Sequence, residues 1–325
     1  MLRALCARSG VCGAPTSSEE EIATMLHSEQ GMVWVDLESP TDQERGILER
    51  VFKFHRLAVE NTFSLSNHPR IDDYGEYLYL AVHGIVRRKG AAIGESRMQL
   101  LEIDIFVGKH FLLTYHAAAD LSIDTVWKRC GHVEHLMARG PDRVLAEVLD
   151  HLAEEYVSFM EVLDEEIDGL EDRLFKHASK PALREIFSLK KDVLHLRRVV
   201  NPQREVLNRL ARAEHKAVSR EESIYFRDVY DHLYRVSEML ESFRDVLSGA
   251  LEVYLTVVAN RTNEVMKVLT VFSAVLMSGS FIAGLYGMNV PVPGAESKSM
   301  FYILSGVMVA LAVVLIVFFK KRRWI

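Results

Sequence analysis

A stripe of small, hydroxyl and thioether side chains follows one face of a segment near the C-terminus. Its members recur at alternating intervals of three and four residues, the spacing of a helical seam: Asn263, Met266, Thr270, Ser273, Met277, Ser280 and Gly284. Such side chains let membrane helices pack closely. They can equally line a narrow polar path, with apolar constrictions at Leu269 and Met277 that gate by dewetting.

Two uncharged segments place this stripe in a membrane. Residues 268–295 and residues 299–319 contain no charged side chain. About 20 apolar residues in a helix cross the hydrocarbon core of a bilayer, where one charge would cost about 3 kcal/mol. We therefore expect two transmembrane helices rather than two buried helices of a large soluble domain.

The flanking charges predict the orientation of these helices. Lys267 precedes the first span and a basic tail, residues 320–325, follows the second, whereas the intervening loop carries only Glu296 and Lys298. By the positive-inside rule, both ends of the hairpin lie in the cytoplasm and the loop lies outside. Trp324 is expected to anchor the tail at the interface. These features predict a two-span protein of the cell (inner) membrane with both termini cytoplasmic.

The charge distribution excludes several classes of protein. The first 267 residues hold 44 of the 45 acidic side chains and 34 of the 39 basic ones. An acidic surface repels phosphate, so nucleic acid is not an expected partner. Three scattered cysteines, Cys6, Cys12 and Cys130, fit a reduced environment rather than a disulfide framework. Arg8 interrupts any signal-peptide core.

The chain divides into seven expected parts. They are an N-terminal segment of unknown role (1–30), a cytoplasmic α/β domain (31–145), a cytoplasmic helical hairpin (146–221), a stalk with the first transmembrane helix (222–286), an outer loop (287–298), the second transmembrane helix (299–319) and a basic tail (320–325). The fold class is therefore an α+β membrane protein with a helical stalk that continues into the membrane.

Strand and helix patterns alternate in the α/β domain. A helix is expected from Pro40 through Phe54, and a turn at Gly108-Lys109 joins the last two strands. Asp72 and Asp73 read as turn residues. β-branched and aromatic residues predict strands at residues 32–37, 77–83, 100–107 and 111–115.

The helical hairpin begins after Pro141. Residues 161–172 contain seven acidic side chains, with Leu163, Ile167, Leu170 and Leu174 at helical spacing. This pattern indicates an amphipathic helix with one solvated face, or else a surface that attracts divalent cations. Residues 188–212 form a basic amphipathic helix that we expect to be its antiparallel partner.

A very long helix follows. No proline occurs between Gln203 and Val290, and apolar residues keep helical spacing from about Glu222 into the first span. Such length is typical of oligomeric packing. Two spans cannot enclose a pathway, but a ring of subunits can.

The end of the first span carries a resemblance to a known family. The sequence Phe281-Ile-Ala-Gly-Leu-Tyr-Gly-Met-Asn289, between a long uncharged helix and a second span with a basic tail, resembles the CorA family of magnesium and cobalt transporters. Residues 226–232, 241–249 and 263–270 are also similar to that family. The likeness covers residue 31 to the end.

The resemblance implies a homopentameric funnel that carries divalent cations. Gly287, Met288 and Asn289 would form the selectivity filter, and the transported ion would be Mg²⁺, with Co²⁺ and by extension Ni²⁺. The ion would pass in hydrated form, because Mg²⁺ gives up its waters reluctantly. The membrane potential would drive uptake, so neither an enzyme activity nor an organic cofactor is expected.

The family's regulatory cation sites imply two further residues. Asp228 matches a stalk aspartate, and Glu60 is its expected partner, but Asn61 replaces the aspartate of the family's Glu-Asp pair. We therefore expect weaker closure by cytosolic Mg²⁺. Ser278-Gly-Ser280 replaces the usual Pro-Leu-Thr, which predicts a smoother or more flexible helix there.

Two alternatives remain open. A zinc transporter of the ZntB type shares the fold, although the histidines are spread over the α/β domain as structural residues would be. A membrane-anchored sensor or scaffold is the more distant alternative. No nucleophile, metalloprotease or nucleotide motif supports an enzyme.

Overall fold

The computed structural model describes residues 1–8, 11–28, 31–64, 68–88, 90, 95–132, 136–176, 179–290, 294, 297–322 and 324. Two compact units make up the chain. The first consists of Met1–Leu174 and Ser179–Leu251, and the second of Phe175–Ala178 and Glu252–Ile325.

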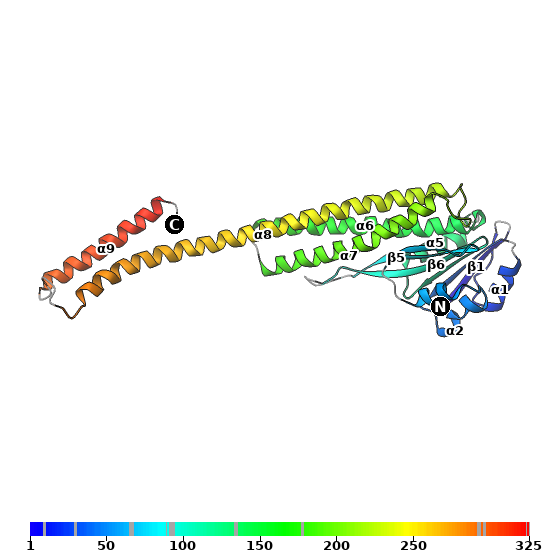
Figure 1. Cartoon of the computed structure of the whole chain (residues 1–325), viewed down its shortest axis with the longest axis horizontal. Coiled ribbons are helices and arrows are strands. Elements are labelled where there is room, and N and C mark those ends of the chain that lie inside the picture. The colour runs from blue at the N-terminus through cyan, green and yellow to red at the C-terminus, as the bar shows by residue number, and fades with distance from the viewer. Residues whose placement is uncertain are drawn as a thin grey trace. The chain divides into compact units, whose positions relative to one another are not determined.

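The described part of the first unit contains a seven-stranded sheet in the order β2-β1-β3-β7-β6-β5-β4 (Figure 1). Only β3 and β7 pair in parallel among these neighbours. The strands are β1 (Leu2–Arg8), β2 (Val11–Cys12), β3 (Met32–Glu38), β4 (Arg70–Asp73), β5 (Tyr77–Arg87), β6 (Met98–Gly108) and β7 (Phe111–His116).

The four predicted strands are found as β3, β5, β6 and β7. The turn between β6 and β7 consists of Lys109 and His110, one residue later than expected, because Gly108 still pairs with Tyr77. The N-terminal segment, for which the sequence suggested no role, joins the sheet. β1 pairs with β3, with Leu5 opposite Trp34, and α1 (Glu19–Ser28) follows.

The prediction of a single helix from Pro40 through Phe54 is wrong. Its start is confirmed, since Thr41 and Glu44 form a capping box at α2 (Asp42–Arg45). The chain then bends at Gly46 and continues as α3 (Ile47–Arg50). Lys53 has a positive φ of 52°, which no helix accommodates, so Phe54 lies beyond the helical segment.

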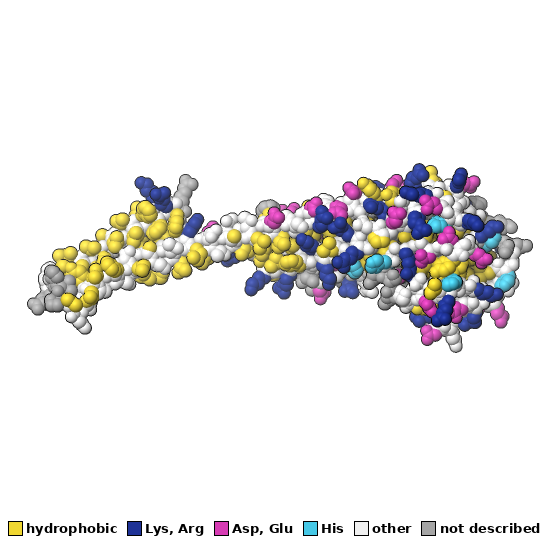
Figure 2. Space-filling view, viewed as in Figure 1, with side chains coloured by type: hydrophobic (Ala, Val, Ile, Leu, Met, Phe, Trp, Pro, Cys, Tyr) yellow, Lys and Arg dark blue, Asp and Glu magenta, His cyan; other side chains and the backbone are white. Residues whose placement is uncertain are grey.

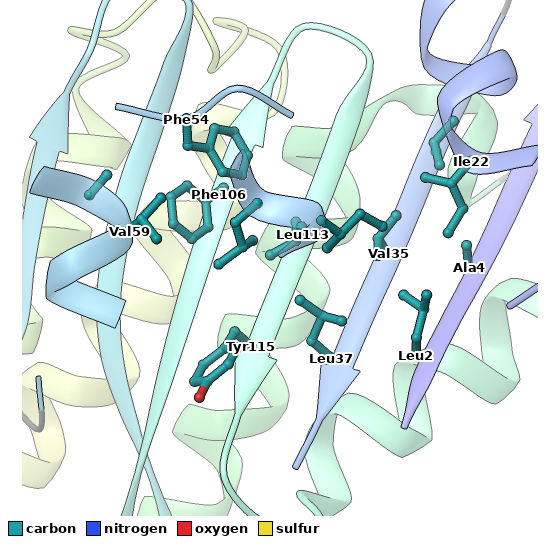
Figure 3. Close-up of a cluster of buried hydrophobic side chains, with 14 of the residues drawn as sticks. Leu2, Ala4, Ile22, Val35, Leu37, Phe54, Val59, Phe106, Leu113 and Tyr115 are labelled. Carbon is teal, nitrogen blue, oxygen red and sulfur yellow. The ribbon is translucent and has the colours of Figure 1, made fainter. Parts of the chain in front are cut away.

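One face of the sheet carries a core of apolar side chains (Figure 3). Phe54 stacks on Phe106, with ring centroids 4.1 Å apart, and α4 (Arg56–Phe63) adds Val59. Leu2 and Ala4 of β1 belong to this core. The N-terminal segment is therefore part of the folding unit.

The long helices α6 (Pro141–Lys176) and α7 (Lys180–Ala211) contact the sheet through β5. The Tyr156 hydroxyl donates to the His83 carbonyl at 3.0 Å, and the Gln203 side chain accepts from the His83 amide at 2.8 Å. α5 (Leu121–His132) and a 3₁₀ turn (Met137–Arg139) precede them.

An arginine directly before β6 links the helical hairpin to the sheet. The Arg97 amide donates to the Asp192 carboxylate at 3.2 Å, and its guanidinium lies 3.8 Å from Glu185 and forms an ion pair with Glu166. Asp192 is 2% exposed. Since α6 and α7 supply all three carboxylates, this cluster fixes both helices.

The acidic run of α6 forms a solvated face. Leu163, Ile167, Leu170 and Leu174 are buried, whereas none of its seven acidic side chains is. α7 begins at Lys180, earlier than expected, because Ser179 caps it by accepting from the Ala182 amide.

The predicted long helix is confirmed as α8 (Ser223–Tyr286), 64 residues without interruption. Its N-terminal part buries Phe226, Val229 and Leu233 in the first unit. In the second unit, its C-terminal part and α9 (Lys298–Lys321) form a hairpin (Figure 1). Both helices are long and apolar enough to cross a membrane.

Candidate functional site

The residues of the predicted stripe are all exposed on the surface of α8. Asn263, Thr270, Ser273, Ser280 and Gly284 are exposed. Met266, Leu269 and Met277 are exposed by 53%, 54% and 76% of their surface. No part of the described chain therefore covers the stripe.

A different face of α8 packs within the hairpin. Val271 is buried, and the half-buried positions are Ala274, Val275, Ser278, Gly279, Ile282 and Tyr286. The half-buried positions of α9 recur in the same way at Leu304, Met308, Leu311, Leu315 and Phe319. At about 100° per residue, the centre of this face lies about 150° from the centre of the stripe. The chain itself thus uses one face of α8 and leaves the opposite one open.

Many hydrophobic side chains lie on the surface of the second unit (Figure 2). Lys and Arg gather at the end of α9, where Lys320, Lys321 and Arg322 follow the apolar segment. This is the distribution that a membrane hairpin requires. Glu296 and Arg323, which entered the orientation argument, lie outside the described residues.

Thr270 gives the stripe a directed acceptor. Its hydroxyl donates to the Met266 carbonyl at 2.8 Å. Because the proton is used inside the helix, the oxygen presents lone pairs outward. That geometry suits the hydrogen atoms of water bound to a cation.

The residues predicted to form the filter follow directly on the end of α8. The Gly287 amide donates to the Ala283 carbonyl at 2.9 Å, which closes the last turn. A Cβ atom at Gly287 would lie 3.1 Å from that carbonyl oxygen, tighter than usual packing. Met288 and Asn289 are exposed beyond it. The carbonyl end of a helix carries partial negative charge, which favours cations here.

Asp228 lies beside a second carboxylate that the sequence did not single out. Asp150 of α6 and Asp228 of α8 line a cavity of about 30 Å³. Burial raises the pKa of Asp150, and the charges of Glu154 and Asp228 raise it further. Among the described residues, no group of three or more His, Cys, Asp or Glu side chains is arranged to hold a bare metal ion. Arg143 and Glu147 line the same cavity, whose volume is that of about one water molecule, so it does not accommodate a hydrated cation.

Glu60 lies elsewhere on the first unit. It is exposed on α4, and its carboxylate accepts from the Arg56 guanidinium at 2.7 Å. No hydrogen bond or ion pair of the described residues joins Glu60 to Asp228. The predicted pair therefore stays a prediction about neighbouring subunits.

Several histidines have structural partners. His116 lies 3.0 Å from the buried Asp36 carboxylate, and its pKa is raised because the favourable interaction with Asp36 outweighs burial. His215 lies 2.9 Å from Asp73. Asp73, the last residue of β4, also accepts from the Gly75 amide at 2.7 Å, as expected of a turn residue. The same prediction for Asp72 is wrong, because Asp72 lies within β4 and pairs with Tyr79.

The family model described as CorA-like Mg²⁺ transporter protein matches residues 29–321. The chain belongs to the CorA-like Mg²⁺ transporter family. It is 32% identical to the cobalt/magnesium transport protein CorA of Thermotoga maritima, over 86% of this chain and 80% of that protein. The predicted fold class is confirmed for this CorA-family chain.

Two solved structures share the fold. The complete CorA magnesium transporter of Methanocaldococcus jannaschii covers 100% of this chain and 99% of its own, with a TM-score of 0.85 and 21% identity. The ZntB cytoplasmic domain of Vibrio parahaemolyticus covers 80% of this chain and 97% of its own, with a TM-score of 0.63 and 14% identity. The fold alone therefore does not distinguish the transported metal.

Proposed function

We propose that this chain forms a homopentameric channel that carries Mg²⁺, together with Co²⁺ and Ni²⁺, across the cell (inner) membrane into the cytoplasm. One observation supports the proposal above others. The chain leaves a polar stripe of α8 uncovered, and that stripe leads to Gly287-Met288-Asn289. The name of the Thermotoga relative supports the choice of cobalt and magnesium.

Several copies would place the open face of α8 around an axis. Small side chains such as Ser273 and Gly284 would leave room for a hydrated ion, while Leu269 and Met277 would form apolar rings. Such apolar rings block the passage of ions when water leaves them. The number of five subunits is taken from the resemblance to the CorA family.

Asn289 would select the ion at the mouth of the path. A ring of amide oxygens accepts hydrogen bonds from the waters of Mg²⁺ without removing them, and no carboxylate is needed. An inside-negative potential contributes about 2.3 kcal/mol per charge per 100 mV, doubled for a divalent ion. Inward movement therefore needs no ATP. Both termini would lie in the cytoplasm.

Asp228 would hold a hydrated regulatory cation together with Glu60 of a neighbouring subunit. Asn61 removes one negative charge per subunit relative to the family pattern. We expect closure by Mg²⁺ to be correspondingly weak.

Ion flux into proteoliposomes tests the function. The chain should pass Mg²⁺, Co²⁺ and Ni²⁺, and Asn289→Ala should abolish Mg²⁺ flux. Light scattering must show the same assembly for both proteins, and Val290→Ala is the neighbouring control. Zn²⁺ flux without Mg²⁺ flux would favour the ZntB alternative. Unchanged flux in Asn289→Ala would favour a membrane-anchored scaffold.

A further inference from the structure

A cavity whose charged side chains are mainly basic lies in the first unit, beside the segment that connects α7 to α8. Its volume is about 710 Å³. Three guanidinium groups line it, from Arg212, Arg220 and Arg227, against one carboxylate, Asp231. The arginines come from three places in the chain: the C-cap of α7, the connecting segment, and the second turn of α8.

The local backbone brings these arginines together. α7 ends at Arg212, and Ala213 takes a positive φ of 49°, which turns the chain sharply. The connection then closes in short turns, in which the Val218 amide donates to the His215 carbonyl at 3.1 Å. Ser223 opens α8 and lines the same cavity. The positive end of the α8 dipole therefore adds to the charge of the arginines.

Two of the three arginines have no side-chain partner among the described residues. Arg220 and Arg227 form no ion pair and no side-chain hydrogen bond with any described residue. Arg212 lies 3.7 Å from Glu214, which is itself exposed. All three arginines are exposed, so their guanidinium groups can be reached by a ligand from solvent.

The chemistry of the lining selects a phosphate-bearing ligand. Guanidinium groups bind phosphate oxygens through paired hydrogen bonds, and a metal cation would be repelled. The volume is in the range of small-molecule sites and exceeds the need of one phosphate. The half-buried ring of Tyr230 and the amide of Asn208 also line the cavity. An aromatic ring and an amide are suitable contacts for a nucleobase.

We propose that this cavity binds a polyphosphate anion of nucleotide size, with Arg220 and Arg227 on the phosphates and Tyr230 against the base. The site is separate from the proposed ion path and does not depend on it.

Isothermal titration calorimetry on the full chain in detergent tests the proposal. The probes are ATP, tripolyphosphate, pyrophosphate, inorganic phosphate and glycerol 3-phosphate, each with excess chelator so that bound Mg²⁺ plays no part. ATP should bind most tightly and inorganic phosphate most weakly. The double variant Arg220→Gln/Arg227→Gln should weaken ATP binding at least about tenfold, from two lost charge-assisted contacts.

The matched control is Arg184→Gln/Lys191→Gln, which removes two exposed charges of α7 outside the cavity. It should leave ATP affinity unchanged. Tyr230→Ala should weaken ATP binding but not tripolyphosphate binding. The proposal is overturned if no probe binds up to millimolar concentration, or if both double variants lose affinity equally. It is also overturned if glycerol 3-phosphate, the shared part of lipid headgroups, binds more tightly than ATP.

Discussion

Asp104 shows how the sheet accommodates a buried carboxyl group. Its side chain is 2% exposed on β6, and the Tyr79 hydroxyl donates to it. Burial raises the pKa of Asp104 to about 8, with a smaller contribution from the charge of Glu102. At neutral pH the folded protein therefore holds this group mainly protonated, whereas the unfolded chain ionises it.

This difference makes stability depend on pH. Between the unfolded pKa of 3.8 and the folded value of about 8, folding takes up a proton, so stability falls as pH rises. The Asp104→Asn variant has a neutral amide at this position at every pH. We expect it to stabilise the fold at pH 7, by up to about 4 kcal/mol at 1.36 kcal/mol per pKa unit, and to have little effect near pH 4.

Thermal unfolding of the full chain in detergent, followed by tryptophan fluorescence across pH, checks this expectation. Asp168→Asn, which changes an exposed carboxylate on α6, is the control and should not change the pH dependence. A stability difference between Asp104→Asn and the parent that is constant from pH 4 to pH 8 would contradict the account.

At the residue scale, the sequence shows which side chains share a helix face where this depends on local spacing. The stripe on α8 and the Gly287-Met288-Asn289 sequence were visible because a helix repeats every few residues. The position of Asp150 beside Asp228 could not be predicted from the sequence. Its partner Asp228 lies on another helix, and only tertiary packing brings the two carboxylates to one cavity.

Among the elements, α8 was the most predictable. Its apolar period and lack of proline correctly indicated one helix through both units. β1 was missed because a short strand at a chain terminus shows its role only through pairing with β3. The break between α2 and α3 was missed because Gly46 can also be tolerated inside a helix.

The α6–α7 hairpin depends on Arg97. Arg97→Met would leave the buried Asp192 carboxylate without its cation and should destabilise the first unit by about 3–5 kcal/mol. Arg173→Met is the control, because Arg173 is exposed and contacts the Glu185 carboxylate from the solvent side. Arg173→Met should lower the free energy of unfolding by less than about 1 kcal/mol.

Chemical denaturation of both variants measures these costs. Adding Asp192→Leu to Arg97→Met should recover part of the loss, because no unpaired charge is then buried. Equal costs for Arg97→Met and Arg173→Met would show that the cluster does not anchor the hairpin.

At the scale of the assembly, Asn61 predicts weak closure by Mg²⁺. Asn61→Asp restores the charge of the family pattern next to Glu60, so half-maximal protection from protease should occur at about tenfold lower Mg²⁺. Asn61→Gln keeps the neutral amide and should behave like the parent. Limited proteolysis titrated with Mg²⁺ measures the midpoints. Strong protection of the parent at sub-millimolar Mg²⁺ would contradict the prediction.

The central claim is that the open face of α8 from several copies surrounds a wet axis. The most direct measurement compares Ser273→Cys on that face with Phe272→Cys on a neighbouring face, both exposed in the chain. A small, positively charged thiol reagent is added to proteoliposomes during Mg²⁺ flux. We predict that it blocks flux through Ser273→Cys and leaves Phe272→Cys and the parent unaffected. Equal block of both variants, or no block of either, would contradict the account.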